Sequence, residues 1–293
     1  MKILLFGKNG QVGWELQRAL APLGELHALG SDAADFAVPE SLADRVRTLR
    51  PDVIVNAAAH TAVDRAEAEP ELARRINAEA PAVLAREADA AGAWLVHYST
   101  DYVFDGSGDA PRDEDAPTGP LNVYGRTKLE AEEAIRASGA RHLVLRTSWV
   151  YGTRGGNFAR TMLRLAQERD RLAVIDDQIG APTGAELIAD VSAHAIRAVV
   201  AGGAPGGTYH LAAAGETSWH GYACRVIEAA RAAGAPVKVA PEAIAAVPSS
   251  EFKTAAERPK NSRLGTGKLR RAFGLTLPPW EVGVDRLLAE ILT

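Results

Sequence analysis

The chain has 293 residues, and 33 Lys and Arg against 37 Asp and Glu give a formal net charge of −4 at pH 7. The basic residues are spread along the sequence, which excludes the charged patch of a nucleic-acid-binding or anionic-membrane-binding protein. A single cysteine, Cys224, excludes an intramolecular disulfide and fits a reducing compartment. No run approaches the ~18 apolar residues of a membrane span, so we expect a soluble, cytoplasmic protein.

The chain begins with an apolar run, Ile3 to Phe6, followed by Gly7, Gly10 and Gly13 and then a helical run from Trp14 to Ala21. Glycines between a strand and a helix let the backbone approach a pyrophosphate and place it at the helix N-terminus. Alone, the pattern also fits an ordinary tight turn. Its position at the first strand favours a dinucleotide-binding turn.

Apolar runs suited to buried parallel strands then alternate with amphipathic, alanine-rich helical stretches. The strands are expected at Ile3 to Phe6, Glu25 to Leu29, Val53 to Asn56, Trp94 to Tyr98 and His142 to Arg146, and the helices at Leu42 to Leu49, Glu71 to Ala91 and Tyr124 to Ala137. This alternation predicts an α/β protein with a Rossmann-type doubly wound parallel sheet. Because ligands bind at the carboxyl edge of such a sheet, Asn56 to Thr61, Ser99 to Asp101 and Thr147 to Trp149 should converge there.

Beyond about Tyr151 the pattern loosens into Gly-rich and Pro-rich clusters. Residues 1–150 are predicted to form the dinucleotide-binding domain, with a return at about 185–212 through a helix from Ala185 to Val200 and a strand from Thr208 to Leu211. Residues 151–184 and 213–293 are predicted to form a smaller, discontinuous substrate-binding lobe.

Tyr124 and Lys128 stand one helical turn apart, so their side chains share one face of the predicted helix. A phenol whose pKa is lowered by a neighbouring ammonium can donate a proton beside a nicotinamide near neutral pH. Other chemistries lack support: the seven histidines are scattered without metal-ligand spacing, and no Gly-x-Ser-x-Gly elbow is present.

The order of these features, a glycine turn, then Asn56-Ala57-Ala58, then Ser99-Thr100, then Tyr124 and Lys128, resembles the extended short-chain dehydrogenase/reductase superfamily. Over nearly the whole chain the resemblance narrows to the dTDP-4-dehydrorhamnose reductase family. The stretches that carry it are Gly7 to Leu16, Arg50 to Asp64, Ser99 to Gly106, Arg146 to Gly152, Asp177 to Thr183 and Arg258 to Ser262. The resemblance implies an NADPH-dependent or NADH-dependent oxidoreductase that reduces the C4 ketone of dTDP-4-dehydro-L-rhamnose to dTDP-L-rhamnose.

The same resemblance implies roles for individual residues. Thr100 would hydrogen-bond the substrate oxygen, Tyr124 would donate the proton, and Lys128 would hold the ribose and lower the pKa of the phenol. Asp101 and Trp149 would contact the sugar, while Arg258 and Asn261 would approach the nucleotide diphosphate. The residues that would line the cofactor site are Gly7, Gly10, Gln11, Val12, Gly13, Asp35, Phe36, Ala59, His60, Thr61, Tyr98, Tyr124 and Lys128.

Several of these assignments have ordinary structural alternatives. His60 fits equally well as an ordinary surface or hydrogen-bonded histidine. For Arg258, the alternative role is a surface salt bridge. For the cofactor, the strand from Glu25 to Leu29 ends in Gly30-Ser31-Asp32 with no carboxylate at the strand end. We therefore expect both NADH and NADPH to be accepted, with Asp35 and Phe36 beside the adenine.

Two other functions remain open. Sugar-nucleotide dehydratases resembling this chain place Asp then Glu after the threonine, whereas Asp101 is followed by Tyr102. An epimerase would use the same triad and retain its cofactor, and some relatives of the family are non-catalytic subunits that bind a dinucleotide. The resemblance also suggests a homodimer around Mg²⁺, with Glu15, Glu186 and Glu290 as candidate ligands, although each glutamate also fits an ordinary solvated helix position.

Overall fold

Six parallel strands form the central sheet, in the order β10-β5-β4-β3-β1-β2. The computed structural model describes residues 1–292. The strands are β1 (Lys2–Phe6), β2 (Glu25–Leu29), β3 (Val53–Asn56), β4 (Trp94–Thr100), β5 (Arg141–Thr147) and β10 (Gly207–His210). The chain leaves β1 toward β2 and then returns to β3 on the other side of β1, so the strand order reverses between β1 and β3. The predicted doubly wound sheet is confirmed.

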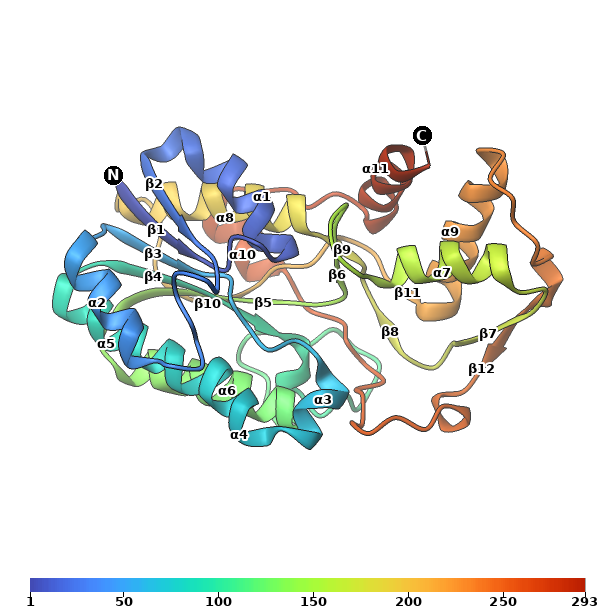
Figure 1. Cartoon of the computed structure of the whole chain (residues 1–293), viewed down its shortest axis with the longest axis horizontal. Coiled ribbons are helices and arrows are strands. Elements are labelled where there is room, and N and C mark those ends of the chain that lie inside the picture. Colours follow the sequence, from blue (N-terminus) through green and yellow to red (C-terminus); the bar gives the residue numbers. More distant parts are fainter. Residues whose placement is uncertain (293) are drawn as a thin grey trace.

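Both faces of the sheet are covered, which is why its central strands are continuous apolar runs (Figure 1). Alternate side chains of one strand enter opposite cores. Ile3 and Leu5 pack with α1 (Gln11–Leu20), α8 (Ala185–Val200) and α10 (Gly267–Phe273) on one face. Leu4 and Phe6 pack with α2 (Glu40–Leu49), α5 (Ala80–Ala91) and α6 (Val123–Ala137) on the other face.

The predicted helix from Glu71 to Ala91 is interrupted. It consists of α4 (Pro70–Arg74), a π-helical turn η2 (Arg75–Glu79) and α5, and it follows the short α3 (Val63–Ala68). A π-turn widens the helix by one residue and often marks a functional site. Here it turns the buried Asn77 toward the strand-end loop after β3, where it bonds the backbone of His60.

A smaller lobe lies beyond the carboxyl ends of the strands and has its own apolar core (Figure 1). Its elements are β6 (Val150–Tyr151), α7 (Phe158–Glu168), β7 (Leu172–Ile175), β8 (Ile179–Gly180), β9 (Thr183–Gly184), β11 (Thr217–Ser218), α9 (Trp219–Ala232), β12 (Ile244–Val247) and α11 (Trp280–Ile291). The remaining short helices are η1 (Ala21–Leu23), η3 (Asp101–Val103), η4 (Pro241–Ala243) and η5 (Ser249–Glu251).

One segment lies elsewhere than the sequence suggested. Residues 213–293 were assigned to the smaller lobe, but Leu269 of α10 and Leu277 pack in the core above the large sheet, beside α8. The chain therefore crosses between the lobes twice more than predicted, because α11 lies in the core of the smaller lobe again. In the described part of the chain, no helix has the length and apolar character needed to span a membrane.

Candidate active site

Two adjoining cavities open at the carboxyl edge of the sheet, where the strand order reverses. Their volumes are about 450 and 290 Å³, and Gly10, Ala57 and Ala59 line both. The larger cavity extends from the N-terminus of α1 past the carboxyl ends of β4 and β5 to the smaller lobe, and the smaller cavity lies beside the end of β2. An open α/β sheet binds its ligands at this place.

Most of the predicted cofactor residues line these cavities. The larger cavity is lined by Gly10, Gln11, Val12, Ala59, Thr61, Tyr98, Tyr124 and Lys128, and the smaller one by Gly7, Gly10, Asp35, Phe36 and Ala59. Gly13 and His60 line neither cavity. Gly13 instead permits close packing, because a Cβ there would lie 2.0 Å from the Gly7 carbonyl oxygen. His60 is fixed by two backbone hydrogen bonds with Asn77 of 2.8 and 3.0 Å.

The glycine turn leaves the start of α1 open. Gly7 has φ +83°, and a Cβ there would lie 2.6 Å from the backbone nitrogen of Ala58, so only glycine fits between the β1 and β3 loops. The N-cap residue Gly10 supplies no side-chain cap, and the first turn carries no acidic residue. The free N–H groups and the positive end of the helix dipole therefore face the cavity, as a pyrophosphate requires.

Thr100, Asp101 and Tyr124 meet in the larger cavity. Thr100 ends β4 and Asp101 begins η3, while Tyr124 lies in the first turn of α6, which Asn122 caps through the Gly125 N–H at 2.8 Å. The Tyr124 phenol hydrogen-bonds Thr100, yet burial raises the pKa of Tyr124 to about 12. Burial likewise raises the pKa of Asp101 to about 6, although hydroxyl hydrogen bonds oppose this.

Lys128 lies one turn after Tyr124 but does not act on its phenol in this structure. The ammonium nitrogen lies 2.6 Å from the carbonyl oxygen of Tyr98 and 3.1 Å from Nε2 of His97. Burial lowers the pKa of Lys128 to about 8, and the Glu132 charge opposes this. The sequence-based expectation that Lys128 lowers the pKa of Tyr124 is therefore wrong for this structure, where burial dominates.

Two tryptophans form the wall of the cavity toward the smaller lobe. Trp149 has φ +48°, unusual for a large side chain, and stacks on Trp219 with a centroid distance of 3.7 Å and an angle of 14°. Trp219 begins α9 and is held by a 3.1 Å bond from Nε1 to Gln178. Gly180 leaves the space beneath Trp149, since a Cβ there would lie 2.8 Å from the indole. Trp149 lines the larger cavity, and its contact with a sugar stays a prediction; Trp219 lines the same cavity and was not singled out from the sequence.

Arg258 and Asn261 are committed to other contacts. Arg258 binds Asp64 through N–O distances of 2.6 and 3.2 Å, which is the salt bridge weighed as its alternative role. Asn261 is buried, and its amide donates to the backbone carbonyls of Ala110 and Ser107 at 2.9 and 3.3 Å. Neither lines the two cavities, so their approach to a diphosphate stays a prediction.

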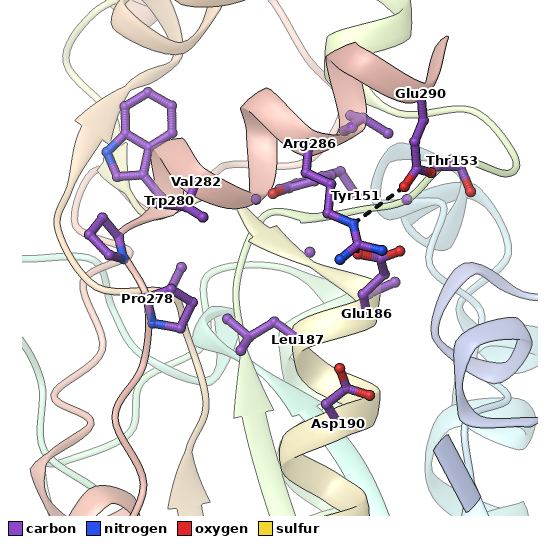
Figure 2. A pocket seen from close by; sticks show the side chains of 17 residues that line it. Tyr151, Thr153, Glu186, Leu187, Asp190, Pro278, Trp280, Val282, Arg286 and Glu290 are labelled. Atoms are coloured by element: carbon purple, nitrogen blue, oxygen red, sulfur yellow. Dashed lines mark hydrogen bonds and ion pairs between the residues drawn. The ribbon is translucent and has the colours of Figure 1, made fainter. Parts of the chain in front are cut away.

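Two of the three candidate metal ligands, Glu186 and Glu290, line a separate cavity of about 200 Å³ between α8 and α11 (Figure 2). Arg286 reaches between Glu186 and Glu290, at 3.2 and 3.3 Å. Burial raises the pKa of Glu186, with repulsion from Glu290 and Glu15 adding to the effect. The three glutamates thus share one neighbourhood, but within residues 1–292 no cluster of three acidic, His or Cys side chains has metal-binding geometry.

Behind the site lies a buried polar layer that sequence reasoning did not identify. Its members are Asn56, Asn77, His97, Ser99, Glu132, Arg146 and His210. Polar residues inside otherwise apolar strands were the available signal for His97 and Arg146. Asn77 had none, because the π-turn that positions it has no sequence pattern of its own.

Comparisons with known proteins agree with this geometry. The family described as "RmlD substrate binding domain" matches residues 1–293. A dTDP-4-dehydrorhamnose reductase of Escherichia coli K12 is 57% identical, over 100% of this chain and 99% of the relative.

Two solved structures are also similar. A dTDP-4-dehydrorhamnose reductase from Clostridium acetobutylicum has a TM-score of 0.90 at 34% identity, with 100% of both chains covered. One from Bacillus anthracis, in complex with NADP, has a TM-score of 0.88 at 34% identity, over 99% of this chain and 100% of that one.

Proposed function

The chain belongs to the dTDP-4-dehydrorhamnose reductase family of NADP-dependent oxidoreductases, and we propose that it reduces the C4 ketone of dTDP-4-dehydro-L-rhamnose to give dTDP-L-rhamnose. The observation that carries this proposal is the meeting of Thr100, Tyr124 and Lys128 in one cavity that continues into the groove along the glycine turn. A ketone reduction needs a hydride, a proton donor and orientation of the carbonyl.

The groove fits a dinucleotide. The open N-terminus of α1 suits the pyrophosphate, and the cavity beside Asp35 and Phe36 suits an adenosine. A nicotinamide bound in the larger cavity would supply the hydride to the carbonyl carbon. Lys128 lines that cavity and would hold the ribose hydroxyls, and the small side chains of Ala57 and Ala59 would leave room for a flat ring against the backbone.

Tyr124 is the proton donor. Because burial raises its pKa to about 12, the phenol stays protonated throughout the neutral range, which is the state a reductase requires at the start of each turnover. Its proton passes to the carbonyl oxygen as the hydride arrives, while Thr100 hydrogen-bonds the same oxygen. Lys128 in its ammonium form can then return a proton to the phenolate.

The side chains around the sugar favour reduction over dehydration. Of the described residues that line the larger cavity, Asp101 is the one carboxylate. Elimination of water needs a second acid, and its position after Asp101 is occupied by Tyr102, whose ring packs edge-on against Tyr124 with a centroid distance of 5.6 Å. In this proposal Asp101 binds a sugar hydroxyl and Trp149 packs against the sugar ring.

The proposal is tested by incubating the purified protein with dTDP-4-dehydro-L-rhamnose and either NADPH or NADH, following the loss of nicotinamide absorbance and identifying the sugar. We expect cofactor oxidation in proportion to dTDP-L-rhamnose formed. Tight retention of cofactor without net oxidation would instead indicate an epimerase, and binding without any turnover a non-catalytic dinucleotide-binding subunit.

We also propose that the chain forms a homodimer in which Mg²⁺ binds between copies near Glu15, Glu186 and Glu290. The support is their shared neighbourhood and the pKa of Glu186, which is raised by burial and, to a smaller extent, by repulsion from Glu290 and Glu15. Hard oxygen-seeking cations relieve such repulsion. Arg286 now neutralises two of these carboxylates, so an ion would have to displace its guanidinium.

A further inference from the structure

Asn56, His97 and Lys128 form a buried hydrogen-bonded chain that leads from β3 through β4 to α6. Asn56 Nδ2 lies 3.1 Å from His97 Nδ1, and His97 Nε2 lies 3.1 Å from Lys128 Nζ. All three side chains are at most 2% exposed. Because these side chains are shielded from water, each contact must pair a hydrogen-bond donor with an acceptor. The proton position at one contact therefore determines the proton position at the next.

The orientation of Asn56 fixes the first link. The backbone N–H of Ala58 can only donate, and it donates to Asn56 Oδ1 at 3.0 Å. The Asn56 amide nitrogen therefore faces His97 and donates to Nδ1. An imidazole that accepts at Nδ1 and is neutral carries its proton on Nε2. Neutrality follows from the accepting role of Nδ1 and from burial, which lowers the pKa of His97 well below its usual range.

The Nε2–H group then points at Lys128. A nitrogen that already carries three protons cannot accept a hydrogen bond, whereas the free amine has a lone pair. The Lys128 nitrogen also donates to the Tyr98 carbonyl, which an amine can still do. The one arrangement that satisfies every contact in the chain therefore has Lys128 as a neutral amine.

We propose that Asn56 and His97 are positioning residues for the proposed reduction, and that they hold Lys128 as a neutral amine until a cofactor binds. The amine then takes up a proton from water as the cofactor fills the cavity, because the proposed return of a proton to Tyr124 requires the ammonium. Binding of the cofactor and protonation of Lys128 are thereby coupled.

The charges around Lys128 agree with this assignment. Tyr124 and Glu132 lie one turn before and after it on α6, and His97 faces it from β4. Glu132, the charge that favours the ammonium, is bound by Arg146 of β5 at 2.6 and 2.9 Å and by Ser99 at 2.5 Å. The π-turn contributes the uncharged Asn77, and Asp101 of η3 acts on Tyr124. Burial lowers the pKa of Lys128 to about 8. A hydrogen bond donated by His97 to the free amine would lower it further, because it stabilises the neutral form.

The tautomer of His97 can be read without any turnover. Long-range proton–nitrogen NMR spectra of the cofactor-free protein with ¹⁵N-labelled histidine distinguish the two neutral tautomers and the cation, and the signal lost in His97→Gln assigns the ring. We expect the Nε2-protonated tautomer at pH 7. A Nδ1-protonated or cationic ring overturns the proposal, whether or not the protein reduces the sugar.

The second measurement is the pH dependence of kcat/KM for NADPH, which reports groups of the free enzyme. Asn56→Asp keeps an acceptor for the Ala58 N–H group. The new carboxylate can only accept, so the His97 proton should move to Nδ1, and His97 Nε2 then accepts a hydrogen bond from the Lys128 ammonium. One hydrogen bond of ordinary strength corresponds to about one pKa unit, so the alkaline limb should move up by about one pH unit. His97→Leu should also move it up, and His97→Gln, whose amide can donate, should move it less.

Tyr209→Phe is the matched control. Tyr209 lies on the edge strand β10, and the substitution removes a hydroxyl that donates to the Pro205 carbonyl at 2.8 Å. This substitution should not shift the pH dependence of kcat/KM for NADPH. If Asn56→Asp and His97→Leu fold, as judged by circular dichroism, and keep the parent limb, the coupling of His97 to Lys128 is disproved. A sugar that is not reduced at all, with the Nε2 tautomer present, would count against the reductase function alone.

Discussion

Glu132 and Arg146 form an ion pair that is almost completely withdrawn from water, with side-chain exposures of 0% and 2% and N–O distances of 2.6 and 2.9 Å. The pair joins α6, which carries Tyr124 and Lys128, to β5, whose end supplies Thr147. Arg146 also bonds the Glu114 carbonyl at 3.2 Å. The pair thus ties the helix that carries the proposed proton donor to the sheet.

Arg146→Met should destabilise the protein strongly, because it leaves a carboxylate buried without its partner. We expect a loss of about 3–5 kcal/mol in the free energy of unfolding, measured by urea denaturation. Arg225→Met is the control: its pair with Asp285 is 37% and 52% exposed, so about 0–1 kcal/mol should be lost. Equal losses in both variants would contradict the assignment of Glu132 and Arg146 as a structural tie.

Tyr124→Phe should remove the proton donor while keeping the ring packed against Tyr102. We expect kcat to fall by a factor on the order of 10²–10⁴ with cofactor affinity nearly unchanged, as measured by steady-state kinetics and fluorescence titration. Lys128→Met should impair both quantities, since the lysine is placed to hold the ribose. Turnover of Tyr124→Phe at close to the parent rate would show that another group supplies the proton.

The sequence predicted the sheet well for a physical reason. Parallel strands covered on both faces must be apolar throughout, so Ile3 to Phe6 and Val53 to Asn56 could be recognised as strands without any tertiary information. The site followed from the same logic, because the residues after each strand meet at one edge. Thr100 was found in this way, whereas Tyr124 and Lys128 were identified from their spacing of one helical turn and from the family resemblance.

What the sequence did not reveal depends on contacts between distant segments. The stack of Trp149 on Trp219 joins a strand end to a helix of the smaller lobe, and Arg258 meets Asp64 across most of the chain. No local pattern encodes either contact. The pKa of Tyr124 was misjudged for a related reason. The sequence spacing places Lys128 on the same helix face as Tyr124, but its hydrogen-bond partners hold its nitrogen at Tyr98 and His97, and burial sets the pKa of the phenol.

Asp101 should make stability depend on pH in an unusual direction. Burial raises its pKa from 3.8 to about 6, so the folded state binds more protons than the unfolded state between these values. Stability from this group is therefore lost as pH rises, by about 1 kcal/mol between pH 5 and pH 7. Asp101→Asn should remove this pH-dependent contribution. The free energy of unfolding of the variant, relative to that of the parent protein, should therefore increase from pH 5 to pH 7 in urea denaturation. A constant difference between the two proteins would argue against a raised pKa.

Cofactor choice should be permissive. Ser31, Asp35 and Phe36 line the smaller cavity, whereas Asp32 lines only a neighbouring one, so the Asp32 carboxylate does not face the proposed adenosine site. We expect kcat/KM for NADH and NADPH to agree within about a hundredfold, or about 2.7 kcal/mol. Ser31→Asp should shift the ratio toward NADH by about tenfold, because a carboxylate there repels a 2′-phosphate. A larger preference of the parent protein for NADH would indicate that Asp32 turns toward the ribose.

Assembly is best tested at the cavity between α8 and α11 (Figure 2). If Mg²⁺ joins two copies through Glu15, Glu186 and Glu290, sedimentation should show a dimer that EDTA dissociates and added Mg²⁺ restores. Glu186→Gln should weaken this response, because it removes the candidate ligand whose pKa is raised by burial and by its acidic neighbours. Glu168→Gln, which alters an exposed ion pair with Arg164 on α7, should not. A dimer that persists unchanged in EDTA, with unchanged activity, would remove the bridging ion and leave Arg286 as the group that neutralises Glu186 and Glu290.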